Sequence, residues 1–145
     1  MSLPVKIVNR SPFALPQYAT QGSSGMDLRA NVTDDVLVKS LERCLIPTGL
    51  FVELPQGYEA QVRPRSGMAI HQGITCLNSP GTVDSDYRGE IKVVLINLSN
   101  EEQRIKPGDR IAQLVVQKIE KAVWEEVEIL EETGRSGGFG STGKQ

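Results

Sequence analysis

The chain has 145 residues, enough for one domain with a real hydrophobic core. Its formal net charge of −2 and pI of about 5.5 argue against nucleic acid or an anionic membrane surface as partner, but allow a small polyanion held by a few basic residues. No apolar run is long enough to span a membrane, and the N-terminal residues lack the apolar core of a secretory signal, so we expect a cytoplasmic protein.

Short apolar segments with turn residues between them run along most of the chain. This pattern predicts an all-β barrel or sandwich with one or two helical turns at 66–73. The predicted strands are 5–9, 36–38, 44–46, 49–54, 58–63, 73–78, 90–97, 110–120 and 122–130. We predict one barrel domain over residues 1–132.

The two cysteines, Cys44 and Cys76, lie in apolar strand-like segments and have no CxxC partner. This context predicts two reduced, buried thiols and makes a metal or redox pair improbable. The only histidine, His71, has no accompanying nucleophile motif, so we interpret it as a surface residue. Trp124 is interpreted as core or interface packing.

Asp27 stands between small and apolar residues in the segment SGMDLRA. Its carboxylate is a candidate for holding the waters of Mg²⁺ or for pinning a neighbouring loop, and a purely structural Asp is at least as good an interpretation. In the segment RPRSGMA, Arg65 offers a fork for phosphate oxygens, and Ser66 and Gly67 supply backbone N–H groups at a helix start. The alternative there is a surface arginine at an ordinary helix start.

Residues 78–90, NSPGTVDSDYRGE, combine turn residues with two acids, Asp84 and Asp86, and an aromatic residue, Tyr87. The segment could fold back as a hairpin with a polar mouth that holds a flat polar ligand. An ordinary exposed acidic turn has the same composition. Gln113, in PGDRIAQL, is the polar member of an otherwise apolar face, and alone it is weak evidence for a site.

The C-terminal residues 133–145, TGRSGGFGSTGKQ, differ in kind from the rest. Glycine- and serine-rich tails are most often disordered. Arg135 and Phe139 are unusual in such a tail, because a cation and a ring suit contacts with an anionic aromatic ligand. We therefore predict an active-site arm over 133–145 that could reach a neighbouring subunit.

Five segments, in chain order, resemble the five motifs of the trimeric dUTP pyrophosphatase (dUTPase) family. They are SGMDLRA from Ser24, RPRSGMA from Arg63, NSPGTVDSDYRGE from Asn78, PGDRIAQL from Pro107 and GRSGGFGSTG from Gly134. The resemblance implies a jelly-roll-like β-barrel assembled as a homotrimer, with sites drawn from all three chains. It also implies hydrolysis of dUTP to dUMP and pyrophosphate, with Mg²⁺ bound mainly through the triphosphate and no direct protein ligand.

The resemblance further implies roles for single residues. Asp84 would orient and deprotonate the attacking water, and Gln113 would lie near the α-phosphate and that water. Arg65 and Ser66 complete the implied catalytic set, and Asp27 would support the metal's water shell or the third motif. Substrate binding is implied for Arg65, Ser66, Gly67, Asn78, Gly81, Thr82, Val83, Asp84, Tyr87, Lys92, Gln113, Arg135, Phe139 and Gly140.

Within this set, Asn78 and the backbone of 81–84 would read the uracil edge, and Tyr87 would pack under the sugar and exclude a 2′-hydroxyl. Phe139 would stack on the base and Arg135 would pair with the outer phosphates. The implied role of Asp86 is shaping the turn.

The sequence departs from the commonest family pattern at Ser24, Met68 and His71, none of which removes a functional group. Two rival functions remain: a dCTP deaminase-like enzyme, for which the sequence offers no convincing glutamate near the base, and a non-catalytic nucleotide-binding module. The presence of Asp84 and of the Arg135–Phe139 tail argues against the second.

Overall fold

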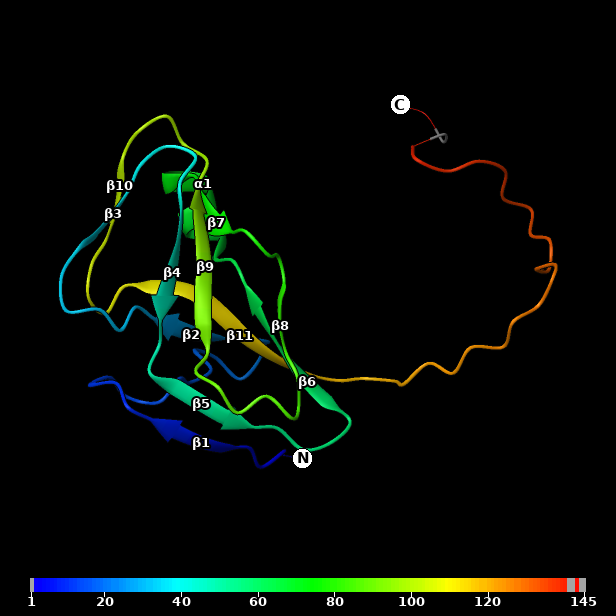
Figure 1. Cartoon of the computed structure of the whole chain (residues 1–145), viewed down its shortest axis with the longest axis horizontal. Coiled ribbons are helices and arrows are strands. Elements are labelled where there is room, and N and C mark those ends of the chain that lie inside the picture. The colour runs from blue at the N-terminus through cyan, green and yellow to red at the C-terminus, as the bar shows by residue number, and fades with distance from the viewer. Residues whose placement is uncertain (1, 141–142, 144–145) are drawn as a thin grey trace.

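The structure is a computed structural model that describes residues 2–140 and 143. Eleven strands and one short helix make up the regular structure of these residues (Figure 1). The strands are β1 (Lys6–Asn9), β2 (Met26–Arg29), β3 (Val36–Val38), β4 (Arg43–Pro47), β5 (Leu50–Glu53), β6 (Tyr58–Arg63), β7 (Ile74–Cys76), β8 (Gly81–Val83), β9 (Lys92–Asn97), β10 (Gln103–Ile105) and β11 (Arg110–Lys118). The prediction of an all-β fold with one short helix is confirmed, and the strands form a jelly-roll-like barrel.

The sheets are antiparallel and are built mainly from strands far apart in the sequence. The four-stranded sheet has the order β2-β11-β6-β8, and the three-stranded sheet has the order β4-β9-β7. Two strand pairs, β1-β5 and β10-β3, complete the barrel. Because β11 lies between β2 and β6, three of the motif segments lie in or beside one sheet. They are SGMDLRA on β2, PGDRIAQL on β11 and RPRSGMA at the end of β6.

The core follows from the alternation of apolar residues along the strands. On β9, Val93 and Leu95 are 0% and 1% exposed, whereas their neighbours Val94 and Ile96 face outward and are half-buried. Each fully buried aliphatic side chain of this kind stabilises the fold by roughly 1.5–3 kcal/mol. Asn97 is buried too, but its amide donates to the carbonyls of Val38 and Glu101 at 2.9 and 2.7 Å, so it is satisfied.

Helix α1 (Ser66–Gln72) links β6 to β7. It ends at Gly73, which adopts the left-handed conformation (φ 65°) and donates its N–H to the carbonyl of Ala69. Only Met68 of the helix is buried, and His71 is exposed as predicted. The helix therefore leaves Ser66 and Gly67 at the surface, beside the end of β6.

The strand predicted over 122–130 is wrong. These residues form no strand, and Val123 and Trp124 are both 92% exposed, so Trp124 is not part of the core. The apolar alternation is present, but no strand of the same chain pairs with it. After β11 the chain leaves the barrel and runs away from it as far as the described end (Figure 1).

Of the arm predicted over 133–145, residues 133–140 and 143 are described, and Arg135, Phe139 and Gly140 among them are exposed. Cys76 is buried as predicted, whereas Cys44 is only half-buried. Burial raises the pKa of the Cys76 thiol to about 11 and also raises the pKa of Cys44. Among the described residues, no helix combines the length and apolarity needed to cross a membrane.

Candidate functional site

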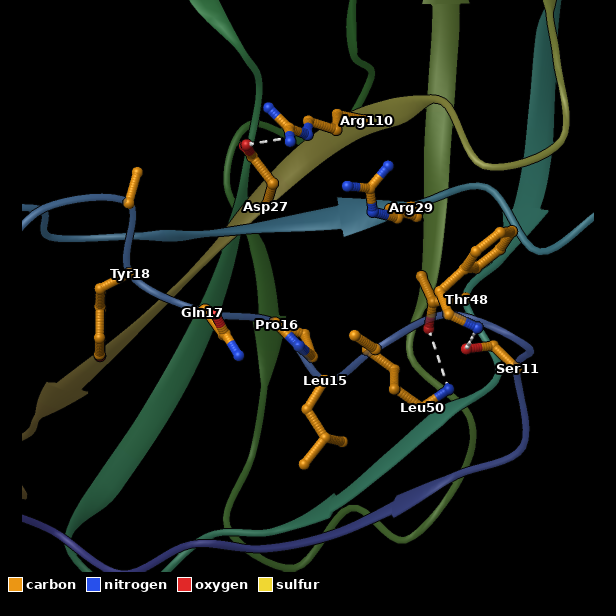
Figure 2. Close-up of a pocket in the computed structure, with 13 residues that line it drawn as sticks. Ser11, Leu15, Pro16, Gln17, Tyr18, Asp27, Arg29, Thr48, Leu50 and Arg110 are labelled. Atoms are coloured by element: carbon orange, nitrogen blue, oxygen red, sulfur yellow. Dashed lines mark hydrogen bonds and ion pairs between the residues drawn. The ribbon is translucent and has the colours of Figure 1, made fainter.

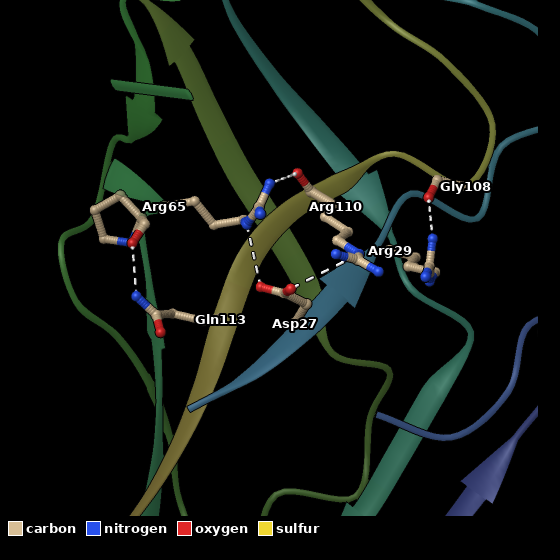
Figure 3. Close-up of polar contacts among 7 residues, drawn as sticks. Asp27, Arg29, Arg65, Gly108, Arg110 and Gln113 are labelled. Carbon is tan, nitrogen blue, oxygen red and sulfur yellow. Dashed lines mark hydrogen bonds and ion pairs between the residues drawn. The ribbon is translucent and has the colours of Figure 1, made fainter. Parts of the chain in front are cut away.

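The first part of the candidate site is a group of charged residues where β2, β11 and the end of β6 meet. Arg65 Nε donates to Asp27 Oδ1 at 3.1 Å, and Arg65 Nη1 donates to the carbonyl of Arg110 at 3.0 Å (Figure 3). Arg110 Nε lies 3.8 Å from Asp27 Oδ2. One carboxylate therefore holds two guanidinium groups beside each other.

Arg29 extends this group along β2, where its Nη1 donates to the carbonyl of Gly108 at 3.0 Å. We call Asp27, Arg29, Arg65 and Arg110 the arginine cluster. Three arginines line a cavity of ≈ 490 Å³, together with Met68, Gln72, Gly108 and Asp109. The three positive charges exceed the two nearby carboxylates, so the cavity favours an anion.

Gln113 is held at the edge of the arginine cluster. Its side-chain amide donates to the carbonyl of Pro64 at 3.2 Å, and its position on β11 lies between Asp27 and Arg63 in register. A Cβ on Gly25 would lie only 2.6 Å from Gln113 Oε1, so the bare backbone of Gly25 makes room for the amide. Gln113 thus has a fixed place next to the Arg65 loop.

A second cavity, of ≈ 340 Å³, opens beside the same residues (Figure 2). It shares Asp27, Arg29 and Arg110 with the arginine cluster, and its other wall comes from the segment 11–19. Leu15 and Pro16 make that wall partly apolar. The arginines therefore border two adjoining spaces, one polar and one with an apolar side.

The third cavity, which we call the base-side pocket, is built from the segment predicted as a ligand loop. It has a volume of ≈ 360 Å³. Its lining includes the predicted residues Asn78, Gly81, Thr82, Val83, Tyr87 and Lys92, and adds Leu45, Val62, Glu90, Ile91 and Val94. The predicted fold-back of 78–90 as a hairpin is wrong, because β8 pairs with β6 while β9 pairs with β4 and β7. The segment nevertheless lines a hollow, which its polar residues share with apolar ones.

Close packing gives the base-side pocket its shape. A Cβ on Gly81 would lie 3.1 Å from Asn78 Nδ2, so the amide of Asn78 rests directly on the backbone of β8. Tyr87 donates its hydroxyl to the carbonyl of Glu90 at 2.8 Å and its N–H to the carbonyl of Asp84 at 3.1 Å. Glu90 Oε2 is buried and has no hydrogen-bond partner within the part of the chain that the structure describes.

The register of β6 separates the base-side pocket from the arginine cluster. Gln113 lies opposite Arg63 at the end of β6, whereas Val83 lies opposite Ala60. Three residues of a strand span about 10 Å, and antiparallel β8 carries the exposed Asp84 still farther away. One chain therefore brings Arg65, Gln113 and Asp27 together but does not bring Asp84 to them.

Sequence reasoning missed Arg29, Arg110 and Glu90. The two arginines lie inside the motif segments SGMDLRA and PGDRIAQL, which was the available signal, but their meeting depends on the pairing of β2 with β11. Glu90 ends the segment 78–90 and resembled an exposed acid there. No polar contact in the structure joins Arg135 or Phe139 to either pocket, since both are exposed on the segment beyond the barrel.

No group of three His, Cys, Asp or Glu residues that could hold a metal ion occurs within residues 2–140 or at 143. The two carboxylate oxygens of Asp27 lie against Arg65 and Arg110, as Figure 3 shows. This donor set does not fit direct metal coordination by the chain.

Comparison with known proteins gives consistent matches over nearly the whole chain. The sequence profile of the dUTPase family matches residues 11–143. The chain is 59% identical over 140 residues to the deoxyuridine 5′-triphosphate nucleotidohydrolase of Finegoldia magna, covering 96% of this chain and 98% of the relative. It is 58% identical over 145 residues to the protein of the same name from Cytophaga hutchinsonii, covering 99% and 94%.

Solved structures show the same fold. A mutant dUTPase of Staphylococcus bacteriophage 80alpha with dUpNHpp superposes with a TM-score of 0.82 at 23% identity, covering 97% of this chain and 98% of that one. The dUTPase of phage phi11 of S. aureus superposes with a TM-score of 0.77 at 20% identity, covering 90% and 99%.

Proposed function

Because the chain belongs to the dUTPase family, we propose that it is a dUTP diphosphatase, an enzyme that hydrolyses dUTP to dUMP and pyrophosphate. In a cell, this reaction keeps uracil out of DNA and supplies dUMP for thymidylate synthesis. The observation that carries the proposal is the pair of spaces described above. One is lined by arginines and suits a polyphosphate, and the other is the base-side pocket, whose partly apolar wall also carries the amide of Asn78 and the ring of Tyr87.

The arginine cluster and its neighbours bind the triphosphate in this proposal. The half-buried Arg65 and the exposed Ser66 and Gly67 present a guanidinium, a hydroxyl and backbone N–H groups beside one another. Asp27 orients Arg65 through the 3.1 Å contact rather than meeting the substrate itself. Gln113, fixed by the carbonyl of Pro64, lies near the α-phosphate.

The base-side pocket selects the nucleoside. Asn78 and the backbone of 81–84 pair with the uracil edge, and Tyr87 packs under the sugar. Cytosine carries a donor where uracil carries an acceptor, so buried groups would be left unpaired. Discrimination by hydrogen bonds of this kind reaches 10⁴ or more. Lys92 lies at the same pocket and adds positive charge towards the nucleotide.

Asp84 is the proposed general base. It accepts a proton from a water molecule whose oxygen attacks the α-phosphorus, and the bond from that phosphorus to the bridging oxygen breaks. The products are dUMP and pyrophosphate, which takes the bonding electron pair. Positioning of the water and positive charge near the phosphates, from Arg65 and Arg135, lower the barrier.

Mg²⁺ is the proposed cofactor. When bound with the triphosphate it neutralises part of the phosphate charge. No group of three His, Cys, Asp or Glu residues in the described part of the chain could hold the ion, and Asp27 is occupied by its two arginines, so contact with Asp27 would run through water. No step of the proposed reaction is assigned to the ion.

A homotrimer with shared sites completes the proposal. The separation of Asp84 from Arg65 along β6 leaves each chain with two half-sites, which a second copy can join. The outer face of the β4-β9-β7 sheet supports assembly, because it exposes apolar side chains: Leu45 is 56% and Leu77 is 46% exposed. A partner that covers this face would bury the apolar residues, as oligomer interfaces do.

The barrel, whose last strand β11 ends at Lys118, and the arm of 133–145 have different roles in this assembly. The exposed Arg135 and Phe139 have the chemistry to cover a nucleotide held by other chains, with Gly140 allowing close backbone approach. We propose the cytoplasm as the location, where the two thiols stay reduced.

One observation favours the deaminase alternative. Glu90 lines the base-side pocket, and its buried Oε2 atom has no hydrogen-bond partner among the described residues. The names of the relatives favour the diphosphatase. The test is to measure pyrophosphate and ammonia release from dUTP, dCTP, dTTP and UTP in parallel, with and without Mg²⁺. We expect pyrophosphate from dUTP alone. Ammonia from dCTP, or equal hydrolysis of all four nucleotides, would contradict the proposal.

A further inference from the structure

Gly89 fixes the place of the Tyr87 ring in the base-side pocket. A Cβ on Gly89 would lie 2.5 Å from Tyr87 Oη, 2.7 Å from Cζ and 3.0 Å from Cε2. Contacts shorter than 3.0 Å to a real Cβ essentially never occur, so a side chain at position 89 would displace the ring. The hydroxyl end of the phenol therefore occupies the space that a Cβ at position 89 would take.

Backbone conformation does not explain the glycine at position 89. Gly49 and Gly73 have φ values of 73° and 65°, in the region where a side chain is strained, whereas Gly89 lies outside that region. An alanine could adopt the Gly89 backbone conformation. A Cβ there would meet the ring of Tyr87, whose exposed hydroxyl end would have to move to make room.

Hydrogen bonds hold Tyr87 both at its hydroxyl and at its backbone N–H. The hydroxyl donates to the carbonyl of Glu90 at 2.8 Å, and the N–H of Tyr87 donates to the carbonyl of Asp84 at 3.1 Å. Arg88 Nη1 donates to the carbonyl of Ser85 at 2.7 Å and closes the same turn. Tyr87 is 44% exposed, so these contacts, and not burial in the core, set its orientation.

We propose that Gly89 is a positioning residue for sugar selection. Because Gly89 has no side chain, the Tyr87 ring can take the position in which it blocks the space for a 2′-hydroxyl. The inference rests on the proposed function, in which Tyr87 packs under the sugar of dUTP. Gly89 itself touches no substrate and acts only through the ring.

The test compares kcat/KM for dUTP with kcat/KM for UTP in four proteins: the wild type, Gly89→Ala, Tyr87→Ala and the double variant. We expect Gly89→Ala to lower the dUTP/UTP ratio at least 10-fold, mainly through KM. In the Tyr87→Ala background the same glycine substitution should change the ratio less than 2-fold, because no ring is left to displace. Gly22→Ala is the matched control, since a Cβ at Gly22 meets nothing within 4 Å.

An unchanged ratio in Gly89→Ala would overturn the inference while leaving the proposed function intact. A further fall in the double variant would also overturn it, because Gly89 would then act on something other than Tyr87. If Gly89→Ala does not fold, the double variant decides: recovery of folding supports the inference, and failure overturns it. Absence of dUTP hydrolysis in the wild type would reject the proposed function first, and the sugar-selection role with it.

Discussion

Arg65 donates to Asp27 across 3.1 Å and so ties the loop after β6 to β2, with Arg110 approaching the other oxygen of the same carboxylate at 3.8 Å. The side chains of Arg65 and Asp27 are 32% and 35% exposed. An ion pair that is partly open to water contributes modestly to stability. Its main effect is therefore to hold the guanidinium where a phosphate can meet it.

Asp27→Asn should weaken that positioning. We expect KM for dUTP to rise about 3- to 10-fold, corresponding to the ~1 kcal/mol typical of a hydrogen bond, with the Mg²⁺ concentration for half-maximal activity unchanged. Asp35→Asn is the matched control, because Asp35 pairs with Arg104 at 3.1 Å in the β10–β3 sheet. A changed Mg²⁺ requirement with normal KM would assign Asp27 to the metal's water shell instead.

Asp84→Asn should separate binding from chemistry. The amide keeps the size of the side chain but is a far poorer proton acceptor, so kcat should fall about 10²- to 10⁴-fold. The dissociation constant for dUTP, measured by calorimetry under conditions without turnover, should stay within about 3-fold of the wild type. Asp86→Asn, an exposed acid in the same loop, is the control and should retain near-normal kcat. Normal turnover in Asp84→Asn would remove Asp84 from its role.

A chain that ends at Thr133 tests the arm. Because Arg135, Phe139 and Gly140 are exposed in the single chain, their loss should leave the melting temperature of the barrel unchanged. Loss of the ring and the cation should lower kcat/KM for dUTP at least 10-fold by removing substrate-positioning contacts. Full activity of the shortened enzyme would show that the tail takes no part in the reaction.

Leu45→Asp tests the assembly. Leu45 lies opposite Val94 on the outer, apolar face of the β4-β9-β7 sheet, and burying an unpaired carboxylate there is costly. Light scattering should show three times the 15.9 kDa chain mass for the wild type and the single-chain mass for the variant. Activity is not the readout, because Leu45 also lines the base-side pocket. Leu37→Asp, at a comparably exposed leucine on β3, should remain trimeric. A monomeric wild type with full activity would reject shared sites.

The raised pKa of the Cys76 thiol predicts that the folded protein loses stability at alkaline pH. The thiol's folded pKa of about 11 lies above the ordinary 9.0, so the unfolded chain releases the thiol proton first as the pH rises. The free energy of unfolding should therefore fall between pH 9 and 11, by up to about 1.4 kcal/mol per pH unit. Urea unfolding of the wild type and Cys76→Ala at pH 8 and 10 measures this difference. Equal pH dependence of the two proteins would contradict it.

The sequence predicted well wherever local pattern decides structure. The apolar alternation of β9 and β11, the short helix that begins at Ser66 and the exposed His71 are examples. The prediction failed where a strand needs a neighbouring strand to pair with. Residues 122–130 have the apolar alternation of a strand, but none of the described strands pairs with them. The short strands β2, β8 and β10 went unpredicted, because MDLR, GTV and QRI mix apolar with polar or glycine residues, whereas the equally short β3 (VLV) is wholly apolar.

In the candidate site, too, the sequence predicted the residues that lie close together in the chain and missed those that strand pairing brings together. The members of the base-side pocket within 78–90 are close enough in sequence for a motif to reveal them, whereas Leu45 and Val62 come from other strands and were not predicted. Arg29 and Arg110 are 81 positions apart by their numbers and meet through the pairing of β2 with β11, which no local pattern encodes. The distance between Asp84 and Arg65 likewise depends on the register of β6.

That register has a genetic consequence. A chain that lacks a working Asp84 still carries an intact arginine cluster, and a chain that lacks Arg65 still carries an intact base-side pocket. In a mixed form of the proposed trimer, each chain can lend the other the half-site that it lacks. Mutations in this single 145-residue polypeptide should therefore fall into two complementation groups, divided by position along β6.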